Sequence, residues 1–191
     1  MWGDDDVAIK AGGNGGCQNI LVEDCAILHG HGVSIGSETY NGVKGMLVRN
    51  CTFDGTTPAL RIKSGVDRGG TVTDVTYQNC TLKNVSIAIE LNMVYDPKNG
   101  PAASRPDGQR SVPHVKEIVF RNITATGAKQ AIKIAGLQEA PIEDVTFENV
   151  KIDADTGVNA EYAKGIVFKN VDIQVKKGEP VVTKDAEIKR E

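Results

Sequence analysis

The chain is built from a repeated segment, and this repeat restricts its fold more than any other feature. Each copy alternates β-branched and polar residues, continues with Asn or Asp, and ends with a small or apolar residue. The six copies are CQNILVEDCAI (17–27), VKGMLVRNCTF (43–53), VTDVTYQNCTL (72–82), VKEIVFRNITA (115–125), IEDVTFENVKI (142–152) and AKGIVFKNVDI (163–173). Alternation with a period of two indicates β-strands. A strand-bearing unit of about 26 residues therefore recurs along the chain.

A second, shorter strand is predicted between successive copies. Its segments are VAIKAG (7–12), GVSIGS (32–37), ALRIKS (59–64), AIELNM (88–93) and AIKIAG (131–136), which align on Ile9, Ile35, Ile62, Leu91 and Ile134. The two series keep in step, so a whole multi-strand coil repeats. This pattern predicts an all-β fold, a parallel β-helix of about seven coils that forms one domain over 1–191. A leucine-rich repeat is the alternative, but β-branched residues occupy the positions where that repeat needs Leu.

The Asn and Asp positions of the long segments form one predicted column. They are Asp24, Asn50, Asn79, Asn122, Asn149 and Asn170, at steps of 26, 29, 43, 27 and 21 residues. We expect a structural ladder in which each side chain bonds backbone at a turn. The 43-residue step contains an insertion, residues 96–114, whose Pro, Gly and charged residues predict a long surface loop. Three cysteines each follow the column, and we interpret them as core thiols, with a disulfide between neighbouring coils as the alternative.

Composition excludes several classes of partner. The 191 residues carry 22 Lys and Arg against 25 Asp and Glu, a formal net charge of −3. A nucleic-acid groove would need a basic excess, so we expect no nucleic-acid partner. No apolar run approaches the length of a membrane span, so we expect no membrane partner either. No residue pattern calls for a cofactor, and the cysteines lack the paired spacing of a zinc site.

Chemically active side chains recur around the short strand. Relative to its aligned apolar residue, Asp5 and His31 lie four positions before, Arg61 and Lys63 lie on either side, and Tyr95 lies four positions after. In a β-helix, equivalent positions on neighbouring coils are about 4.8 Å apart. The carboxylate, the histidine, the two cations and the phenol can therefore share one groove.

Four motifs resemble those of the polygalacturonases, glycoside hydrolase family 28. They are GDDDVAIKAG, GHGVSIGS, ALRIKS and, more loosely, IELNMVYDP, which occur in the family's order over residues 3–95. The resemblance implies a right-handed, single-stranded parallel β-helix of the pectin-lyase type. It also implies inverting hydrolysis of α-1,4-galacturonosyl linkages in pectin or oligogalacturonides.

The resemblance assigns catalysis to three residues. Asp4 would be the general acid that protonates the leaving oxygen, Asp5 would help to activate water, and His31 would tune the protonation of the acid. Glycoside hydrolysis needs one protonated and one ionised carboxyl group. Crowded carboxylates push their pKa values apart, and so can supply both from two aspartates.

The resemblance assigns substrate binding to Arg61, Lys63 and Tyr95. The two cations would hold the galacturonate carboxylate at the cleavage position, because a guanidinium fork and a point-charge ammonium both suit an anionic sugar. Tyr95 would contact the same sugar.

The chain departs from the family pattern in two ways. Asp6 stands where many relatives carry Cys, and the family's third aspartate, one coil before the Asp pair, has no counterpart after Met1. The chain therefore resembles the C-terminal portion of the family, and we expect an N-terminally truncated helix. Its uncapped first coil predicts self-association. The parent protein is expected to be secreted or periplasmic, as its relatives generally are.

Other functions stay open at this point. The chain could be a catalytically impaired β-helix that binds acidic sugars, or only a scaffold. It could also be a calcium-dependent pectate lyase, although the His31 motif is unexpected there. Endo or exo action, and homogalacturonan or substituted pectin, are likewise undecided.

Overall fold

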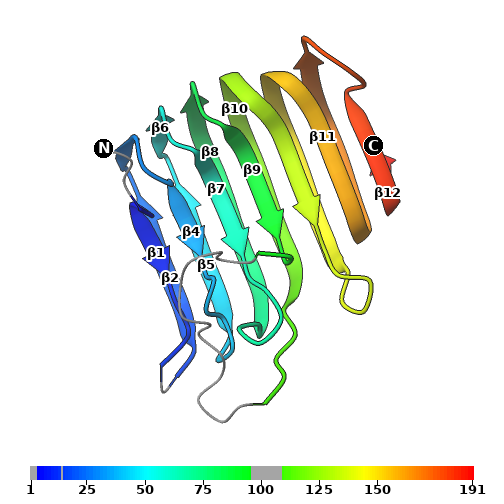
Figure 1. Cartoon of the computed structure of the whole chain (residues 1–191). Coiled ribbons are helices and arrows are strands. Elements are labelled where there is room, and N and C mark those ends of the chain that lie inside the picture. The colour runs from blue at the N-terminus through cyan, green and yellow to red at the C-terminus, as the bar shows by residue number, and fades with distance from the viewer. Residues whose placement is uncertain (1–3, 14, 96–108) are drawn as a thin grey trace.

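The fold is an all-β parallel β-helix, as predicted. The computed structural model describes residues 4–13, 15–95 and 109–191, and these contain strands but no helix. The strands stack side by side from the N-terminus to the C-terminus and form a coiled, open tube (Figure 1). They are β1 (Val7–Ile9), β2 (Cys17–Glu23), β3 (Ala26–Leu28), β4 (Val33–Ile35), β5 (Val43–Arg49), β6 (Thr52–Asp54), β7 (Pro58–Lys63), β8 (Thr71–Lys83), β9 (Ile87–Asn92), β10 (His114–Ala135), β11 (Ile142–Val175) and β12 (Val181–Arg190).

The predicted alignment of the short strands is the observed register. The strands β1, β4, β7 and β9, the end of β10, the middle of β11 and the start of β12 pair in parallel and form what we call the site sheet. One column across it runs through Ile9, Ile35, Ile62, Leu91, Ile134, Ala160 and Thr183. Period-two alternation then points the residues on either side of that column outward.

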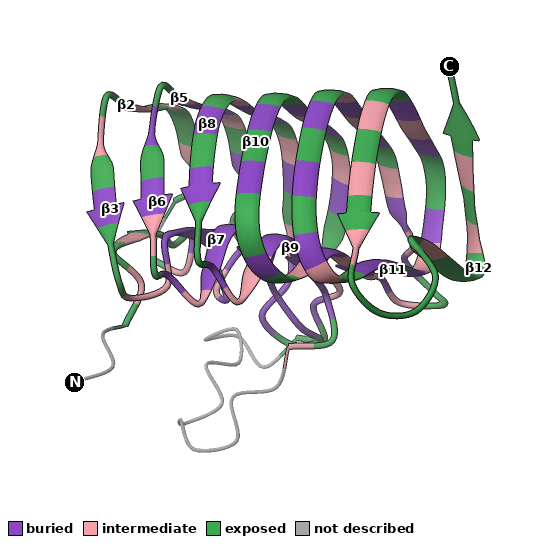
Figure 2. Ribbon diagram, turned by 90° about the horizontal axis from the view of Figure 1, so that it is seen from above, coloured by how far each residue is buried: buried purple, intermediate pink, exposed green. Residues whose placement is uncertain are grey.

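Apolar residues from every coil stack inside the tube. Buried and exposed residues alternate along much of the long strands β8, β10 and β11, so that one side of the ribbon faces the interior (Figure 2), whereas β4, β7 and β9 are buried at nearly every position. Four aromatic rings on successive coils pack in a row, with ring centroids 5.0 Å apart for Tyr77 and Phe120 and 5.1 Å apart for both Phe120–Phe147 and Phe147–Phe168. The first two pairs are stacked, and the third meets edge to face. Each coil therefore buries its apolar side chains against its neighbours, which is how a solenoid stabilises its repeats.

The Asn column is a ladder, but its bonds differ from the predicted ones. Each side-chain amide donates to the oxygen of the preceding member, at 3.2, 3.2, 2.9, 3.2 and 2.8 Å from Asn50 to Asn170. The prediction of bonds to backbone was wrong, because the stacked side chains are close enough to bond one another. All six members have φ between 52° and 54°, a left-handed conformation that Asn and Asp tolerate better than other non-glycine residues.

The cysteines are free thiols, and the prediction of a core position is confirmed for two of the three in the column, while Cys25 is only partly buried. Cys51 and Cys80 are buried, and Cys80 pairs in register with Ile123 of the next coil. The alternative of a disulfide between neighbours is not observed. Of the predicted insertion, residues 96–108 lie outside the described part, and residues 109–113 lead irregularly into β10. A search of the described residues for a helix long and apolar enough to cross a membrane finds none.

Candidate functional site

A Gly-His-Gly turn places His31 at the start of β4. Gly32 has a φ of +60°, and a Cβ at this position would lie 2.2 Å from the carbonyl oxygen of Ala59 on the next coil. Only glycine fits such a close approach between backbones. The Gly32 amide donates to the Asp6 carboxylate at 2.9 Å, so Asp6 holds this turn in place.

Predicted site residues from successive coils line one hollow of about 310 Å³. Asp4 precedes β1, His31 precedes β4, Arg61 and Lys63 lie on β7, and Tyr95 follows β9. Five of the six predicted residues therefore share this surface, together with Thr57, Pro58, Ser86, Ile87 and Glu90. The sixth, Asp5, does not line the hollow but forms ion pairs with Arg61 and Lys63, which do.

Asp5 is the anchor of the cluster. Its side chain is 5% exposed and accepts from the Lys63 ammonium at 2.7 Å and the Ser34 hydroxyl at 2.8 Å. The Arg61 guanidinium lies 3.6 Å away. A buried carboxylate needs such partners, because burial removes its hydration. Asp5 and Lys63 are therefore held in fixed positions two coils apart.

Arg61 lies between two carboxylates and faces Tyr95. Its Nε is 2.9 Å from Glu90 Oε2, yet the N–H does not point at that oxygen and finds no hydrogen-bond partner among the described residues. The distance makes an ion pair without the alignment of a hydrogen bond. Arg61 Cζ and Lys63 Nζ each lie 5.3 Å from the centre of the Tyr95 ring, within cation–π range.

Asp4 is exposed beside the hollow. The Asp5 backbone amide donates to Asp4 Oδ1 at 2.8 Å and holds the pKa of the Asp4 carboxyl below its ordinary value. The positive charges of Lys63 and His31 lower this pKa further. The His31 backbone amide donates to the Asp4 carbonyl oxygen at 3.2 Å, and His31 Nδ1 contacts the Thr57 hydroxyl. Histidine and aspartate thus lie on adjacent coils, as predicted.

Three contributors were not predicted from the sequence: Ser34, Thr57 and Glu90. Ser34 and Glu90 are in register with Arg61 on the neighbouring coils. The column position was available from the sequence, because each of them directly precedes the aligned apolar residue of its strand. A serine or a glutamate at that position does not by itself indicate a functional site. Its role can be recognised only when the charged side chains beside it are known.

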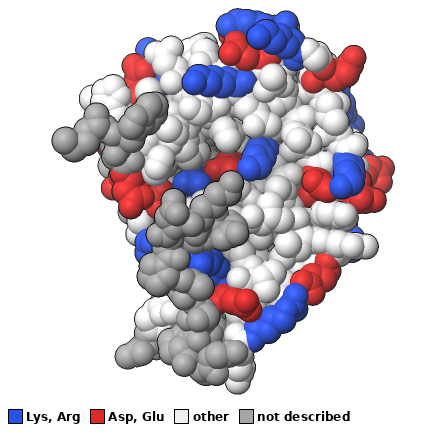
Figure 3. Space-filling model, in the orientation of Figure 1, with Lys and Arg blue, Asp and Glu red and all other residues white. Residues whose placement is uncertain are grey.

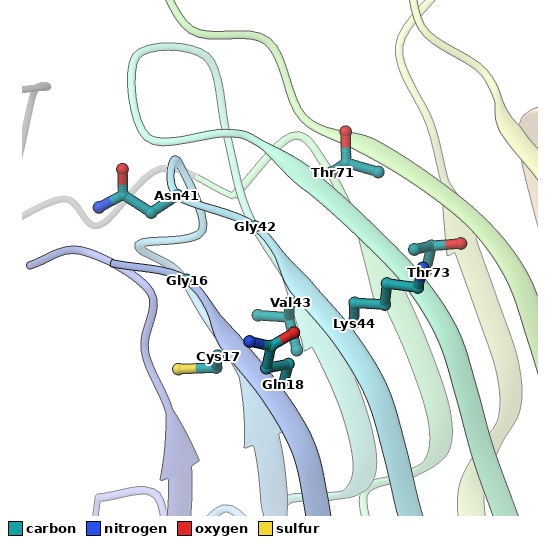
Figure 4. A pocket seen from close by; sticks show the side chains of 9 residues that line it. All are labelled: Gly16, Cys17, Gln18, Asn41, Gly42, Val43, Lys44, Thr71 and Thr73. Atoms are coloured by element: carbon teal, nitrogen blue, oxygen red, sulfur yellow. The ribbon is translucent and has the colours of Figure 1, made fainter. Parts of the chain in front are cut away.

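A second hollow, of about 410 Å³, lies at the starts of β2, β5 and β8 (Figure 4). Gln18, Lys44 and Thr73, which are in register with one another, contribute polar atoms to its lining. It contains none of the predicted site residues.

The fold and the hollow define a parallel β-helix protein with a groove lined by a carboxylate, a histidine and two cations. The structure is similar to a hyperthermoactive exopolygalacturonase from Thermotoga maritima, with a TM-score of 0.77 and 28% identity over 90% of this chain and 39% of that one. It has the same fold as the family 28 exopolygalacturonase of Yersinia enterocolitica, with a TM-score of 0.76 and 19% identity over 98% of this chain and 35% of that one.

The chain belongs to the glycosyl hydrolases family 28, whose model matches residues 1–175. It is 38% identical to an endo-polygalacturonase from Pectobacterium carotovorum subsp. carotovorum over 81% of this chain and 36% of the relative. It is 34% identical to a polygalacturonase from Ralstonia solanacearum over 79% of this chain and 29% of the relative. The chain therefore spans about a third of the length of these relatives.

Proposed function

We propose that this chain forms the uronate-binding and cleavage groove of a polygalacturonase-type hydrolase that acts on α-1,4-galacturonosyl linkages of pectin. One observation carries the proposal. A carboxylate, a histidine and two cations from successive coils converge on a single hollow. Membership of a glycosyl hydrolase family favours hydrolysis over the lyase alternative.

Substrate binding follows from the two cations. The Lys63 side chain is only 7% exposed and that of Arg61 only 11%, so both charges lie where water screens them weakly. The carboxylate of a galacturonate in the hollow would accept from both. The Tyr95 ring beside both cations provides an apolar wall for the sugar.

Catalysis would use the two aspartates in different roles. Asp4 lies at the hollow and would donate a proton to the leaving oxygen. Asp5, oriented by Lys63 and Ser34, would help to position and activate the attacking water. Inverting hydrolases place their acid and base about 6.5–9.5 Å apart to admit that water. In this scheme the glycosidic bond breaks as the leaving oxygen takes the proton of Asp4. The water oxygen forms the new bond to the anomeric carbon, and the water loses its proton to the Asp5 carboxylate.

The test is reducing-end release from polygalacturonic acid by this chain and by Asp4→Asn. We expect release by the parent chain and at least a hundredfold loss in the variant, because general acid catalysis contributes about 10²–10⁴ in rate. Asp153→Asn, on the exposed face of β11, is the matched control and should keep full activity. Unchanged activity in Asp4→Asn would reject the assignment. The first-formed anomer, followed by NMR, distinguishes inversion from retention.

A second candidate function is acidic-sugar binding without turnover. The lowered pKa of Asp4 favours it, because a general acid must carry a proton at the working pH. Oligogalacturonide binding that Lys63→Ala abolishes, with no release of reducing ends by the parent chain, would support this function. Any turnover by the purified parent chain would exclude it.

A further inference from the structure

Glu90 is held between cations of the two neighbouring coils. Arg61, Glu90 and Lys133 are in register on β7, β9 and β10 and occupy one outward column of the site sheet. The Lys133 ammonium donates to Glu90 Oε1 at 3.2 Å, and Arg61 Nε lies 2.9 Å from Glu90 Oε2. The Glu90 side chain is 6% exposed, and Asn92 also donates to it at 3.2 Å.

This arrangement leaves the column with unmatched positive charge. Asp5 is shared by Lys63 and Arg61, and Glu90 is shared by Arg61 and Lys133. Within the column itself, two cations, Arg61 and Lys133, flank one carboxylate, Glu90. Basic and acidic atoms alternate across the middle of this face (Figure 3). A further anion is therefore favoured here.

Lys133 keeps donors free for a ligand. Its side chain is 33% exposed, while the carboxylate that holds it is almost fully buried. The ammonium has three donors, of which Glu90 takes one. The hydrogen bond to Glu90 already restricts the Lys133 side chain, so that side chain loses less conformational entropy when a ligand binds.

We propose that Lys133 binds the carboxylate of a second uronate, next to the one held by Arg61 and Lys63, and that Glu90 positions Lys133 for this contact. The inference rests on the proposed function and deepens it, because the groove would then recognise consecutive uronates. Arg61 and Lys133 are two coils apart, about 10 Å along the sheet. A linear polyuronate carries one carboxylate on every sugar, so cations repeated along the axis suit such a chain. Glu90, lying between the cations, repels a carboxylate placed midway and keeps the two positions distinct.

The test compares binding of trigalacturonate and galacturonic acid by calorimetry at low salt, in the Asp4→Asn background to prevent hydrolysis. We expect Lys133→Gln to weaken trigalacturonate binding about five- to tenfold, as loss of a charge-assisted contact predicts, and to leave the monomer nearly unchanged. Lys133→Arg should restore the affinity, because it keeps the charge. Lys184→Gln is the matched control, since Lys184 pairs with Glu161 on the same sheet further along the axis.

The role of Glu90 is tested by a double-mutant cycle. If Glu90 positions Lys133, the effects of Glu90→Gln and Lys133→Gln on trigalacturonate affinity should be non-additive. Additive effects would reject the positioning role. If Lys133→Gln and Lys184→Gln have equal effects, or if the monomer is weakened as much as the trimer, the second uronate position is rejected while the proposed function stands. If the parent chain binds neither sugar, the proposed function fails, and this inference with it.

Discussion

Asp5 and Lys63 form the most deeply buried ion pair of the site, and each depends on the other. Removing Lys63 leaves the Asp5 carboxylate with Ser34 and a more distant Arg61 as its partners. The buried charge would then be poorly compensated, which is more costly than the original pair is stabilising.

We expect Lys63→Ala to lower the free energy of unfolding by about 1–3 kcal/mol, measured by urea denaturation. Lys176→Ala removes a pair with Asp155 in which the lysine is 74% exposed. That control should leave stability nearly unchanged, because water screens an exposed pair. Equal effects of the two variants would show that burial does not strengthen the Asp5 pair.

The depressed pKa of Asp4 has a consequence for the pH dependence of hydrolysis. In the free protein, Asp4 loses its proton below the pH at which an ordinary aspartate does. Activity that needs protonated Asp4 therefore falls as the pH rises through this low pKa. A bound galacturonate brings a negative charge nearby, which favours the protonated form and raises the pKa.

We therefore expect the alkaline limb of kcat to lie at higher pH than that of kcat/KM. The kcat profile reports the complex, whereas kcat/KM reports the free protein. Steady-state rates over a range of pH measure both limbs. Limbs at the same pH would show that the substrate does not act on the protonation of Asp4.

At the scale of the structural elements, the Asn ladder joins one turn of every coil. Asn122 accepts from Asn149 and donates to Asn79, and its φ is 53°. Its side chain therefore links three coils, while its backbone holds a conformation that a β-carbon disfavours.

We expect Asn122→Ala to cost about 2–4 kcal/mol in unfolding free energy, because it combines the lost bonds with backbone strain. Asn122→Gly removes the same bonds without that strain and should cost less. Thermal and urea unfolding of both variants separate the two contributions. A glycine variant as destabilised as the alanine variant would assign the whole effect to the ladder bonds.

At the scale of the whole molecule, the first coil presents unpaired strand edges. Among the described residues, β1, β2 and β3 each pair on one side only, with β4, β5 and β6 respectively. Cys17, Ile20, Val22 and Cys25 are only partly buried at this end. An open edge above partly exposed apolar side chains favours pairing with another chain.

We propose that the 191-residue chain self-associates through this edge, and we expect light scattering to show oligomers that grow with concentration. Ala26→Lys on β3 should shift their onset to higher concentration, because charge on an edge strand opposes pairing. Thr52→Lys, at the paired position on β6, is the control and should not change the concentration at which oligomers appear. A monomer at all concentrations would contradict the proposal.

Which residues stack on neighbouring coils could be predicted from the sequence. Which of the stacked side chains then bond one another could not. Ile9, Ile35 and Ile62 aligned correctly because alternation and repeat length together determine which residues stack. That Asp5 reaches across to Lys63 could not be predicted, because side-chain conformations decide which of several nearby charges pair. The interpretation of the Asn column failed for the same reason, since the backbone and the neighbouring side chain were both possible partners.

The site sheet stays in register across the long insertion, where Leu91 pairs with Ile134 although 43 residues separate them instead of about 26. At this step of the helix, the number of residues between two paired positions therefore does not affect their spacing across the sheet. One connection between coils is longer than the others, and the register that aligns Arg61 with Glu90 and Lys133 is kept across it. For protein engineering, the length of a connecting segment is thus a variable that can be changed separately from the strands that carry the site.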